Sequence, residues 1–310
     1  MPTTVDPTNP IFTDLEAARE HFEAIRWPQG CYCPFCGSFD RVAPLGGKSM
    51  GPGWYHCKDC RKKFTAAVGT IYERSHIPMT KWLLATHLMC ASKKGMSAHQ
   101  LHRMIGLPYK TAWLMCHRIR EGMRDLKPTG PLGGSGKTVA FDETYVGGKE
   151  ANKHRSKRNS GNIGGKGKEA VFSLVERGGE VRSHHVANVT AKTLRPIMDE
   201  QIAKATRTMS DDGGARARHG SPEHHSVNHS IGEYVRGDVH TNTMEGYFSI
   251  MKRGIAGVYH HVSPQHLKRY LAEHEFRAAL DVTDAERTVK AIKGVVGKRL
   301  TYRHPDERPN

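Results

Sequence analysis

A carboxylate and an ammonium seven residues apart form the most informative pair in this sequence. Glu245 and Lys252 lie in the run HTNTMEGYFSIMKRG, residues 240 to 254. If the run is helical, both side chains lie on one stripe, about 10 Å apart along the axis. Enzymes that cut and join DNA require an acid that binds a metal ion and a cation that holds a phosphate. Taken alone, such a pair is more often solvated surface.

Further acids in the sequence change this interpretation. Asp142 lies in the apolar run VAFDETYVGG, where a carboxylate needs a partner or a metal ion. Asp211 and Asp212 begin a glycine-rich stretch, where the end of a strand could present one of them. An acid within a strand, one at the end of a later strand and one on a following helix are the parts of a two-metal phosphoryl-transfer site.

The cysteine spacing predicts a zinc site. Two CxxC pairs stand 20 residues apart, namely Cys33 with Cys36 and Cys57 with Cys60. Two such turns close a tetrahedral site, and four thiolates leave no position for water, so the zinc is expected to be structural. Cys31 is an additional candidate ligand, and the alternative is a set of unrelated buried cysteines. Cys90 and Cys116 lie in apolar helical contexts and are expected in the core.

Residues 93 to 124 have the form of a helix-turn-helix. Ser97 can cap the first helix, and Gly106-Leu107-Pro108 provides the break. The expected inward residues of the second helix are Trp113, Met115 or Cys116, and Ile119. The residues expected to face solvent or DNA are Tyr109, Lys110, His117, Arg118 and Arg120. The alternative is an ordinary helical hairpin with a basic exposed face.

A basic, glycine-rich loop runs from residue 147 to residue 168. Its cationic members are Lys149, Lys153, His154, Arg155, Lys157, Arg158, Lys166 and Lys168. We expect this loop to hold the DNA backbone without reading sequence, as we do for Lys252 and Arg253. A solvated loop without a partner is the alternative.

Histidines gather in the second half of the chain. They are His219, His224, His225, His229, His240, His260, His261 and His266. No HExxH pair is present, so DNA contact or plain surface is expected for most of them. His240 is expected to begin the helix that carries Glu245.

Composition narrows the class of protein. The chain has 310 residues, a formal net charge of +16, a pI near 9.6 and a mean hydropathy of −0.60. Such a basic chain is expected to bind a polyanion, of which nucleic acid is the commonest. No apolar run reaches the length of a membrane span, and the acidic start is unlike a signal peptide. We therefore expect a cytoplasmic protein with reduced cysteines and no membrane partner.

Local patterns place the elements that must position these residues. Helices are expected at 11–26, within 80–124, and at 190–206, 240–254, 264–280 and 283–293. A strand is expected at TVAFDETYVGG, and Gly178-Gly179 predicts a hairpin. The predicted organisation is an N-terminal helix and zinc ribbon (1–75), a helix-turn-helix-like region (76–128), a linker (129–138), a catalytic domain (139–282) and a C-terminal helix and tail (283–310).

Several long motifs resemble those of one family. CPFCG, CKDCRKKF, FDETYVGGKEANKH and HTNTMEGYFSIMKRGIAGVYHHVSPQHLKRYLAEHEFR are similar to ISXO-type bacterial insertion-sequence transposases, over roughly residues 15 to 280. The resemblance implies an α/β fold. It implies an N-terminal zinc ribbon and a ribonuclease-H-like DDE core, which is a mixed sheet with helices. The helix-turn-helix-like region inferred above lies between them.

The resemblance also implies roles for particular residues. Asp142 is the first catalytic acid. Asp211 is the second, with Asp212 as the alternative, because the usual motif appears here as SDDGG. Glu245 is the third, with Asn242 as the competing ligand, and Lys252 follows seven residues later. The loop after SDDGG lacks the aromatic residues that are usual in the family.

The expected function is DNA transposition. Mg²⁺ or Mn²⁺ would be the catalytic ion in cleavage at the element ends and in strand transfer into target DNA. The expected partners are double-stranded DNA and further copies of the chain in the DNA complex, at the bacterial nucleoid. The alternatives are a DNA-binding repressor or inactive element product, and a metal-dependent nuclease without strand transfer.

Overall fold

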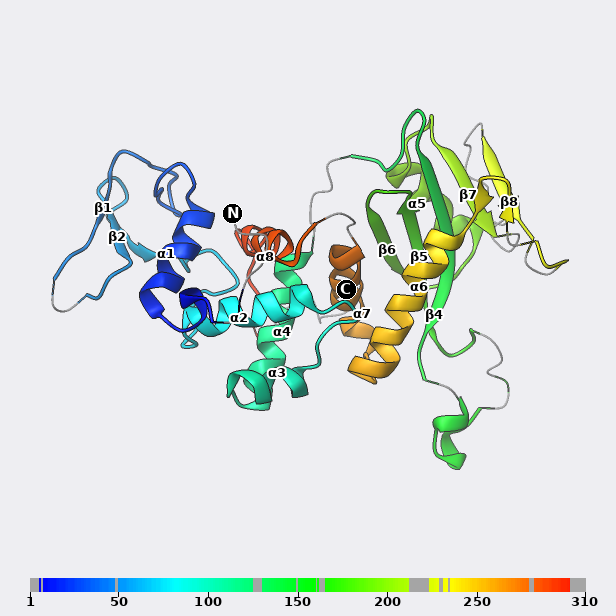
Figure 1. The fold of residues 1–310 in the computed structure, drawn as a ribbon, viewed down its shortest axis with the longest axis horizontal. Coiled ribbons are helices and arrows are strands. Elements are labelled where there is room, and N and C mark those ends of the chain that lie inside the picture. The colour runs from blue at the N-terminus through cyan, green and yellow to red at the C-terminus, as the bar shows by residue number, and fades with distance from the viewer. Residues whose placement is uncertain are drawn as a thin grey trace. The chain divides into compact units, whose positions relative to one another are not determined.

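The chain divides into two compact units (Figure 1). The computed structural model describes residues 6, 8–47, 50–124, 130–148, 150–159, 161, 165–211, 223–228, 231–233, 235–278 and 282–301. Unit 1 combines Met1–Arg124 with Val282–Asn310, and unit 2 is Asp125–Asp281. Among the described helices, none has the length and apolar character that crossing a membrane requires.

Unit 1 begins with a short helix and a small sheet. The 3-10 helix η1 (Pro10–Phe12) precedes α1 (Leu15–Arg26), whose first turn is capped by the Asp14 carboxylate. The sheet has the order β1-β2-β3, with antiparallel pairs, and consists of β1 (Val42–Pro44), β2 (Trp54–Cys57) and β3 (Lys63–Thr65). The apolar face of α1 is buried through Ala18, Phe22 and Ile25. The helix predicted at 11–26 is confirmed from Leu15 onward, and its predicted start was wrong because η1 precedes it.

The helical part of unit 1 follows the predicted pattern. It consists of α2 (Met79–Ala91), α3 (Ala98–Ile105), α4 (Tyr109–Met123) and α8 (Asp284–Lys293). The Ser97 hydroxyl accepts a hydrogen bond from Gln100 N–H and begins α3, and Gly106 ends it in the left-handed conformation, with φ +62°. Both predicted helix boundaries at this turn are therefore confirmed.

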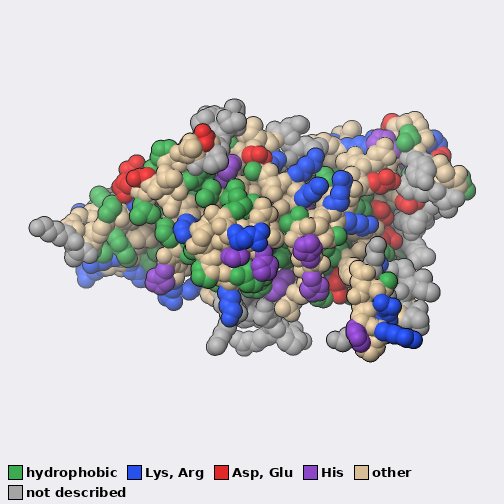
Figure 2. Space-filling view, turned by 60° about the horizontal axis from the view of Figure 1, so that its bottom comes forward, with side chains coloured by type: hydrophobic (Ala, Val, Ile, Leu, Met, Phe, Trp, Pro, Cys, Tyr) green, Lys and Arg blue, Asp and Glu red, His purple; other side chains and the backbone are tan. Residues whose placement is uncertain are grey.

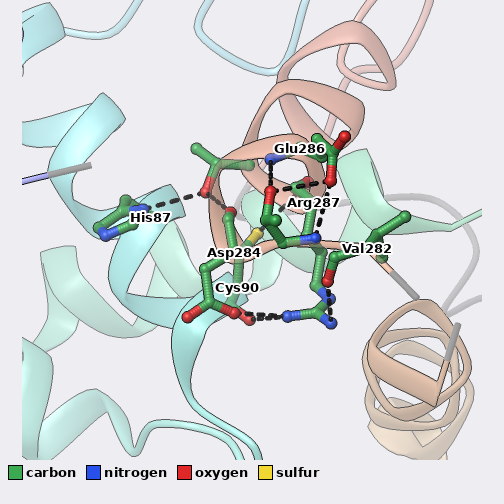
Figure 3. Close-up of polar contacts among 8 residues, drawn as sticks. His87, Cys90, Val282, Asp284, Glu286 and Arg287 are labelled. Atoms are coloured by element: carbon green, nitrogen blue, oxygen red, sulfur yellow. Dashed lines mark hydrogen bonds and ion pairs between the residues drawn. The ribbon is translucent and has the colours of Figure 1, made fainter. Parts of the chain in front are cut away.

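The C-terminal helix α8 packs on α2 within unit 1 (Figure 3). The His87 ring lies 3.1 Å from the Thr288 hydroxyl, Nδ1 to Oγ1. Arg287 donates to the Cys90 carbonyl at 3.3 Å, and Thr283 with Glu286 forms a capping box at the start of α8. Segments about 200 residues apart in the sequence are thus joined by buried polar contacts.

Unit 2 is built on a five-stranded mixed sheet with the order β6-β5-β4-β7-β8. The strands are β4 (Thr138–Val146), β5 (Glu169–Glu176), β6 (Val181–Val186), β7 (Arg207–Asp211) and β8 (His224–Val227). The pairs β4-β5 and β5-β6 are antiparallel, while β4-β7 and β7-β8 are parallel. Gly178 adopts φ +67° in the β5-β6 turn, which confirms the predicted hairpin.

Helices cover both faces of this sheet (Figure 1). The alternation along β4 buries Ala140 and Val146 under α6 (Asn242–Gly254) and α7 (Pro264–Ala278). Val139 and Phe141 face the other side, with Leu194 and Met198 of α5 (Ala191–Gln201). The predicted α/β class with a mixed sheet is confirmed.

Some predicted boundaries were wrong. Helix α5 ends at Gln201 rather than at residue 206, because the chain turns into β7. His240 lies in the short strand β10 (Val239–His240), paired with β9 (Val235–Arg236), and does not begin α6. A π-helical turn, η6 (Ile255–Tyr259), extends α6, and the basic loop contains the 3-10 turns η2 (Glu150–Asn152) and η3 (Arg155–Lys157).

Candidate active site

Two carboxylates occupy equivalent positions on adjacent parallel strands. Ala140 of β4 is aligned with Met209 of β7, and Asp142 and Asp211 each follow two residues later. Ala140 and Met209 both pack under α6. Since side chains alternate along a strand, Asp142 and Asp211 are on this same face. The sheet therefore sets two acids side by side under the helix that carries Glu245.

The surroundings of Asp142 perturb its ionisation. Its Oδ1 accepts a hydrogen bond from the N–H of Glu143 at 2.7 Å. The pKa of Asp142 is raised to about 7, mainly by burial and in part by the negative charges of Glu143 and Asp211. The hydrogen bond from the Glu143 N–H and the positive charge of Lys252 act in the opposite direction. Asp211 and Lys252 therefore lie close enough to act electrostatically on Asp142.

Helix α6 carries both Glu245 and Lys252. Glu245 is in its first turn, with Lys252 two turns later, and both side chains are exposed. The Thr241 hydroxyl donates to the Glu245 carboxylate at 3.4 Å, and the Lys252 ammonium lies 5.9 Å from the centroid of the Phe248 ring. Asn242 is the first residue of the helix and is also exposed.

The charge and the oxygen ligands of these carboxylates suit a divalent cation. A half-buried Asp142 with a raised pKa beside Asp211 is a site where a positive ion would offset unfavourable charge. The carboxylate oxygens of Asp142, Asp211 and Glu245 do not all lie within 4.8 Å of one another. Within the described part of the chain, the four cysteines are the group of three or more potential ligands that lie this close together.

A row of hydroxyl groups continues from Asp142 across the sheet. Ser173 of β5 is directly opposite Asp142, and Ser183 of β6 is directly opposite Ser173. The two serine oxygens are 2.9 Å apart, and Ser183 Oγ lies 2.8 Å from the hydroxyl of Tyr247 on α6. Burial raises the pKa of Tyr247, so it stays a neutral phenol. No local sequence pattern predicts this row, since it depends on strand register.

An arginine fixes the chain just before α6. The Arg177 guanidinium, from the β5-β6 turn, donates to the carbonyls of Asp238 and His240 at 2.9 and 3.0 Å. Thr241, the residue before the helix, follows directly. Arg177 and Tyr247 therefore hold α6 to the sheet at two points, one at its start and one in its second turn.

The four predicted zinc ligands converge in unit 1. Their sulfur atoms all lie within 4.8 Å of one another, and Cys33 Sγ is 3.5 Å from Cys60 Sγ while Cys36 Sγ is 3.6 Å from Cys57 Sγ. These separations suit a tetrahedral site with Zn–S bonds of about 2.3 Å. The N–H of Cys60 helps to lower the pKa of Cys57 to about 7, which favours the thiolate. Gly37 closes the first knuckle with φ +79°.

Cys31 lies outside this cluster, and its pKa is raised to about 11 by burial. A thiol held in this form is a weaker metal ligand than a thiolate. Cys90 and Cys116 are buried in the helical core, as predicted. The cluster of four thus agrees with a structural zinc ion.

Two arginines of α4 that were expected to face solvent or DNA make contacts within the folded chain: Arg120 is buried, and Arg118 is hydrogen-bonded to the backbone. Arg120 has 1% of its surface exposed, and His117 is buried as well. Arg118 donates from Nε to the carbonyl of Leu300 at 2.8 Å. The predicted exposure was therefore wrong for Arg120 and His117. The contact of Arg118 with the C-terminal segment is one that no local pattern reveals. Tyr109 and Lys110 are exposed, as expected.

The basic loop keeps most of its described cations at the surface, visible at lower right in Figure 2. His154, Arg155 and Arg158 are exposed, and Lys153 is half-buried. Arg158 donates to the carbonyls of Ala151 and Lys153, at 2.7 and 2.9 Å. Lys149 and the side chain of Lys157 lie outside the described residues, as do Asp212 and the SDDGG loop beyond Asp211.

His224 and His225, two of the histidines of the second half, are engaged in ordinary contacts. His224 lies near the hydroxyls of Thr208 and Ser210 at 3.0 and 3.3 Å, and His225 pairs with Glu223. Arg253, at the end of α6, is exposed and donates to Ser249. His219 and His229 lie outside the described residues.

Comparison with known proteins identifies the class. Residues 131–279 match the ISXO2-like transposase domain, and residues 14–63 match a transposase zinc-ribbon domain. A protein described as an uncharacterized protein in transposable element ISH50, from Halobacterium salinarum, is 30% identical over 297 residues, which cover 91% of this chain and 96% of the relative.

These matches and the fold define a DDE-type transposase with a zinc ribbon and a ribonuclease-H-like core. The chain belongs to the family of ISXO2-like transposases. Membership implies a phosphoryl-transfer enzyme that binds DNA. The predicted resemblance and fold class are thereby confirmed.

Proposed function

We propose that this transposase cleaves the ends of its insertion sequence in a metal-dependent reaction and transfers the freed strand to target DNA. The observation that supports this most directly is the side-by-side placement of Asp142 and Asp211 on parallel strands, with the charge of Lys252 acting on Asp142. Acids so placed can share cations that bridge a scissile phosphate.

The catalytic roles follow from charge and position. Asp142, Asp211 and Glu245 would hold two Mg²⁺ or Mn²⁺ ions, with Asn242 as the competing third ligand. When bound, the ions would supply activation of the attacking oxygen and stabilisation of the leaving oxygen. Because the pKa of Asp142 is raised to about 7, its carboxyl must lose a proton to become a ligand. Lys252 would hold a DNA phosphate in place by charge.

Recognition of DNA is assigned to both units. The zinc ribbon and the helix-turn-helix would recognise the terminal inverted repeats, with Lys110 at the start of α4. Lys252, Arg253 and the basic loop would contact backbone phosphates, the loop through Lys153, Arg155, Lys157 and Arg158. Joining two ends in one reaction requires at least a dimer in the DNA complex, and a DNA substrate would place the protein at the nucleoid.

To test this function, the protein is incubated with labelled element ends, Mg²⁺ and a target plasmid, and the labelled products are identified. Joined products would support transposition. Cleaved ends without joining would indicate a nuclease, and binding without cleavage would indicate a repressor or inactive product. Either of these last two outcomes would contradict the proposal.

The identity of the third ligand is tested in the same assay. Glu245→Gln should abolish cleavage, whereas Asn242→Ala should leave most of it, because only Glu245 supplies a negative charge to the ions. The reverse pattern would assign the third position to Asn242.

A further inference from the structure

Exposed aromatic rings surround the first zinc knuckle. Phe35 and Phe39 have 47% and 50% of their surface exposed, although both belong to a segment that is otherwise tightly folded around the cysteines. We call Tyr32, Phe35 and Phe39 the aromatic face of the ribbon. Figure 2 shows hydrophobic and basic side chains together at the surface of the zinc ribbon, at left. Exposed rings at a rigid site commonly mark a binding surface.

Contacts beneath the rings hold them in fixed orientations. The Phe35 ring meets the fully buried Phe64 edge to face, with centroids 6.5 Å apart and an interplanar angle of 82°. Phe39 packs against Tyr32 at 5.5 Å, and Tyr32 in turn packs against the buried Trp27 at 6.3 Å. Rings that are already ordered lose little conformational entropy when a ligand binds.

The charge around the rings favours a polyanion. Residues 31–66 include six Lys or Arg residues and two Asp residues, a formal charge of +4. The Lys62 ammonium lies 4.5 Å from the centroid of the Phe35 ring. Its described neighbours Lys58, Arg61 and Lys63 are exposed. Asp59, one of the two acids, is paired with Arg41 at 3.3 Å. A hydrophobic protein partner would not need this concentration of cations.

Ring faces and cations side by side are the features of sites for unpaired nucleic acid. In an intact duplex the bases are stacked on one another, so a protein ring reaches them only by unstacking them, whereas the phosphates are accessible throughout. Lysines alone would therefore hold a duplex by its phosphates. The exposed phenyl rings can stack on base faces without an unstacking cost only where a strand is unpaired.

We propose that the aromatic face of the zinc ribbon stacks on unpaired DNA bases, with Lys62 beside the adjoining phosphate. The identification of DNA as the ligand rests on the proposed function. The substrate class is thereby narrowed to element ends in which one strand is locally unpaired, as at a frayed or nicked terminus.

Fluorescence anisotropy of the zinc-loaded full chain tests this proposal with a labelled single strand and a duplex of the same sequence. For Phe35→Ala/Phe39→Ala, we expect the affinity for the single strand to fall on the order of tenfold or more, since base stacking dominates such binding. Affinity for the duplex should change less than about twofold, because its phosphate contacts remain. Phe35→Tyr/Phe39→Tyr should bind like the unmodified chain, because tyrosine retains the stacking surface.

Leu15→Ala is the matched control. Leu15 is an apolar residue of the same unit, with 63% of its surface exposed, and it lies on α1 rather than at the knuckle. The control should bind both ligands normally, and an unchanged zinc content of every variant would show that the ribbon is folded.

Two outcomes would overturn the proposal. Either the double alanine variant binds the single strand as tightly as the unmodified chain, or it loses duplex affinity to the same extent. The proposed function is tested separately by end joining. A chain that joins ends but shows no role for the rings would contradict the base-stacking proposal and leave the proposed function intact. Conversely, a chain that stacks bases but does not cleave would contradict only the catalytic assignment.

Discussion

Asp142 and Ser173 occupy directly opposite positions on β4 and β5, so the candidate catalytic acid lies at the end of a row of hydroxyls. The row passes through Ser183 to Tyr247 of α6. The same helix carries Glu245 and Lys252. The sheet that holds the first acid is thus hydrogen-bonded to the helix that holds the other two charged groups of the candidate site.

The hydrogen bond between Ser183 and Tyr247 should contribute measurably to stability. Tyr247→Phe removes the phenol hydroxyl and should lower the free energy of unfolding by about 1 kcal/mol. Ser183→Ala should lower it by a similar amount. In a double-mutant cycle the two effects should not add, since each variant loses the same bond. Urea unfolding measures this, Tyr145→Phe at an exposed tyrosine is the control, and strict additivity would refute the coupling.

Zinc binding should distinguish the clustered cysteines from their neighbour. Cys57→Ser removes a ligand with a pKa lowered to about 7 and should abolish stoichiometric zinc and unfold the ribbon. Cys31→Ser should retain one zinc ion per chain, because Cys31 lies outside the cluster. Metal analysis of the purified variants decides this. Equal loss of zinc from both would mean that the ligand set is wrong.

Lys110 and Arg118 should behave differently although both lie on α4. Lys110→Ala should weaken duplex binding and reduce the slope of log K against log salt by about 1, with stability unchanged, as expected for a phosphate contact. Arg118→Ala should instead destabilise unit 1, because its guanidinium holds the Leu300 carbonyl. Binding titrations at several salt concentrations, with thermal unfolding of each variant, test this contrast. A reduced salt slope for Arg118→Ala with unchanged stability would contradict it.

The stability of unit 1 should depend on pH through His87. Burial lowers the pKa of His87 from its ordinary value of 6.5, with a smaller opposing effect of Asp284. Between pH 6.5 and the lowered pKa, the His87 side chain is mostly protonated in the unfolded chain and mostly neutral in the folded chain. The free energy of unfolding should therefore be greatest above pH 6.5 and decrease as the pH falls toward the lowered pKa.

Unfolding measured between pH 5 and 8 should show a weaker pH dependence for His87→Gln than for the unmodified chain (the range in which histidine titrates). His76→Gln, at an exposed histidine of the same unit, should retain the full dependence. If His87→Gln retained it as well, another group would be responsible.

Much of this organisation could be predicted from the sequence because the signals are local. The CxxC spacing located the zinc cluster, and the cap at Ser97 with Gly106 located the turn between α3 and α4. Asp142 and Asp211 were placed correctly in strands, because an acid within or at the end of an apolar run is a local pattern.

The remainder depended on contacts between distant segments. Arg120 is buried in the folded unit, and Arg118 is engaged by the C-terminal segment at Leu300. The row from Ser173 to Tyr247 requires the register of three strands and a helix. The strands β8 to β10 have four residues or fewer and lacked a periodic signal.

The second acid can be assigned by comparing two adjacent positions. Asp211→Asn should abolish cleavage of an element end, because this residue is aligned with Asp142 across β4 and β7. Asp212→Asn should retain cleavage within about tenfold, because Asp211 is the acid in register with Asp142. Single-turnover cleavage measures both, and the opposite result would move the second ligand to Asp212.

The most direct test of the account compares Asp142→Asn with Glu143→Gln in single-turnover cleavage of a labelled element end with Mg²⁺. Both changes remove one carboxylate charge from β4, but only Asp142 is on the face beneath α6. We predict that Asp142→Asn binds the DNA normally and cleaves more than about a hundredfold more slowly, whereas Glu143→Gln stays within about tenfold of the unmodified chain. Cleavage that persists in Asp142→Asn would contradict the proposed site.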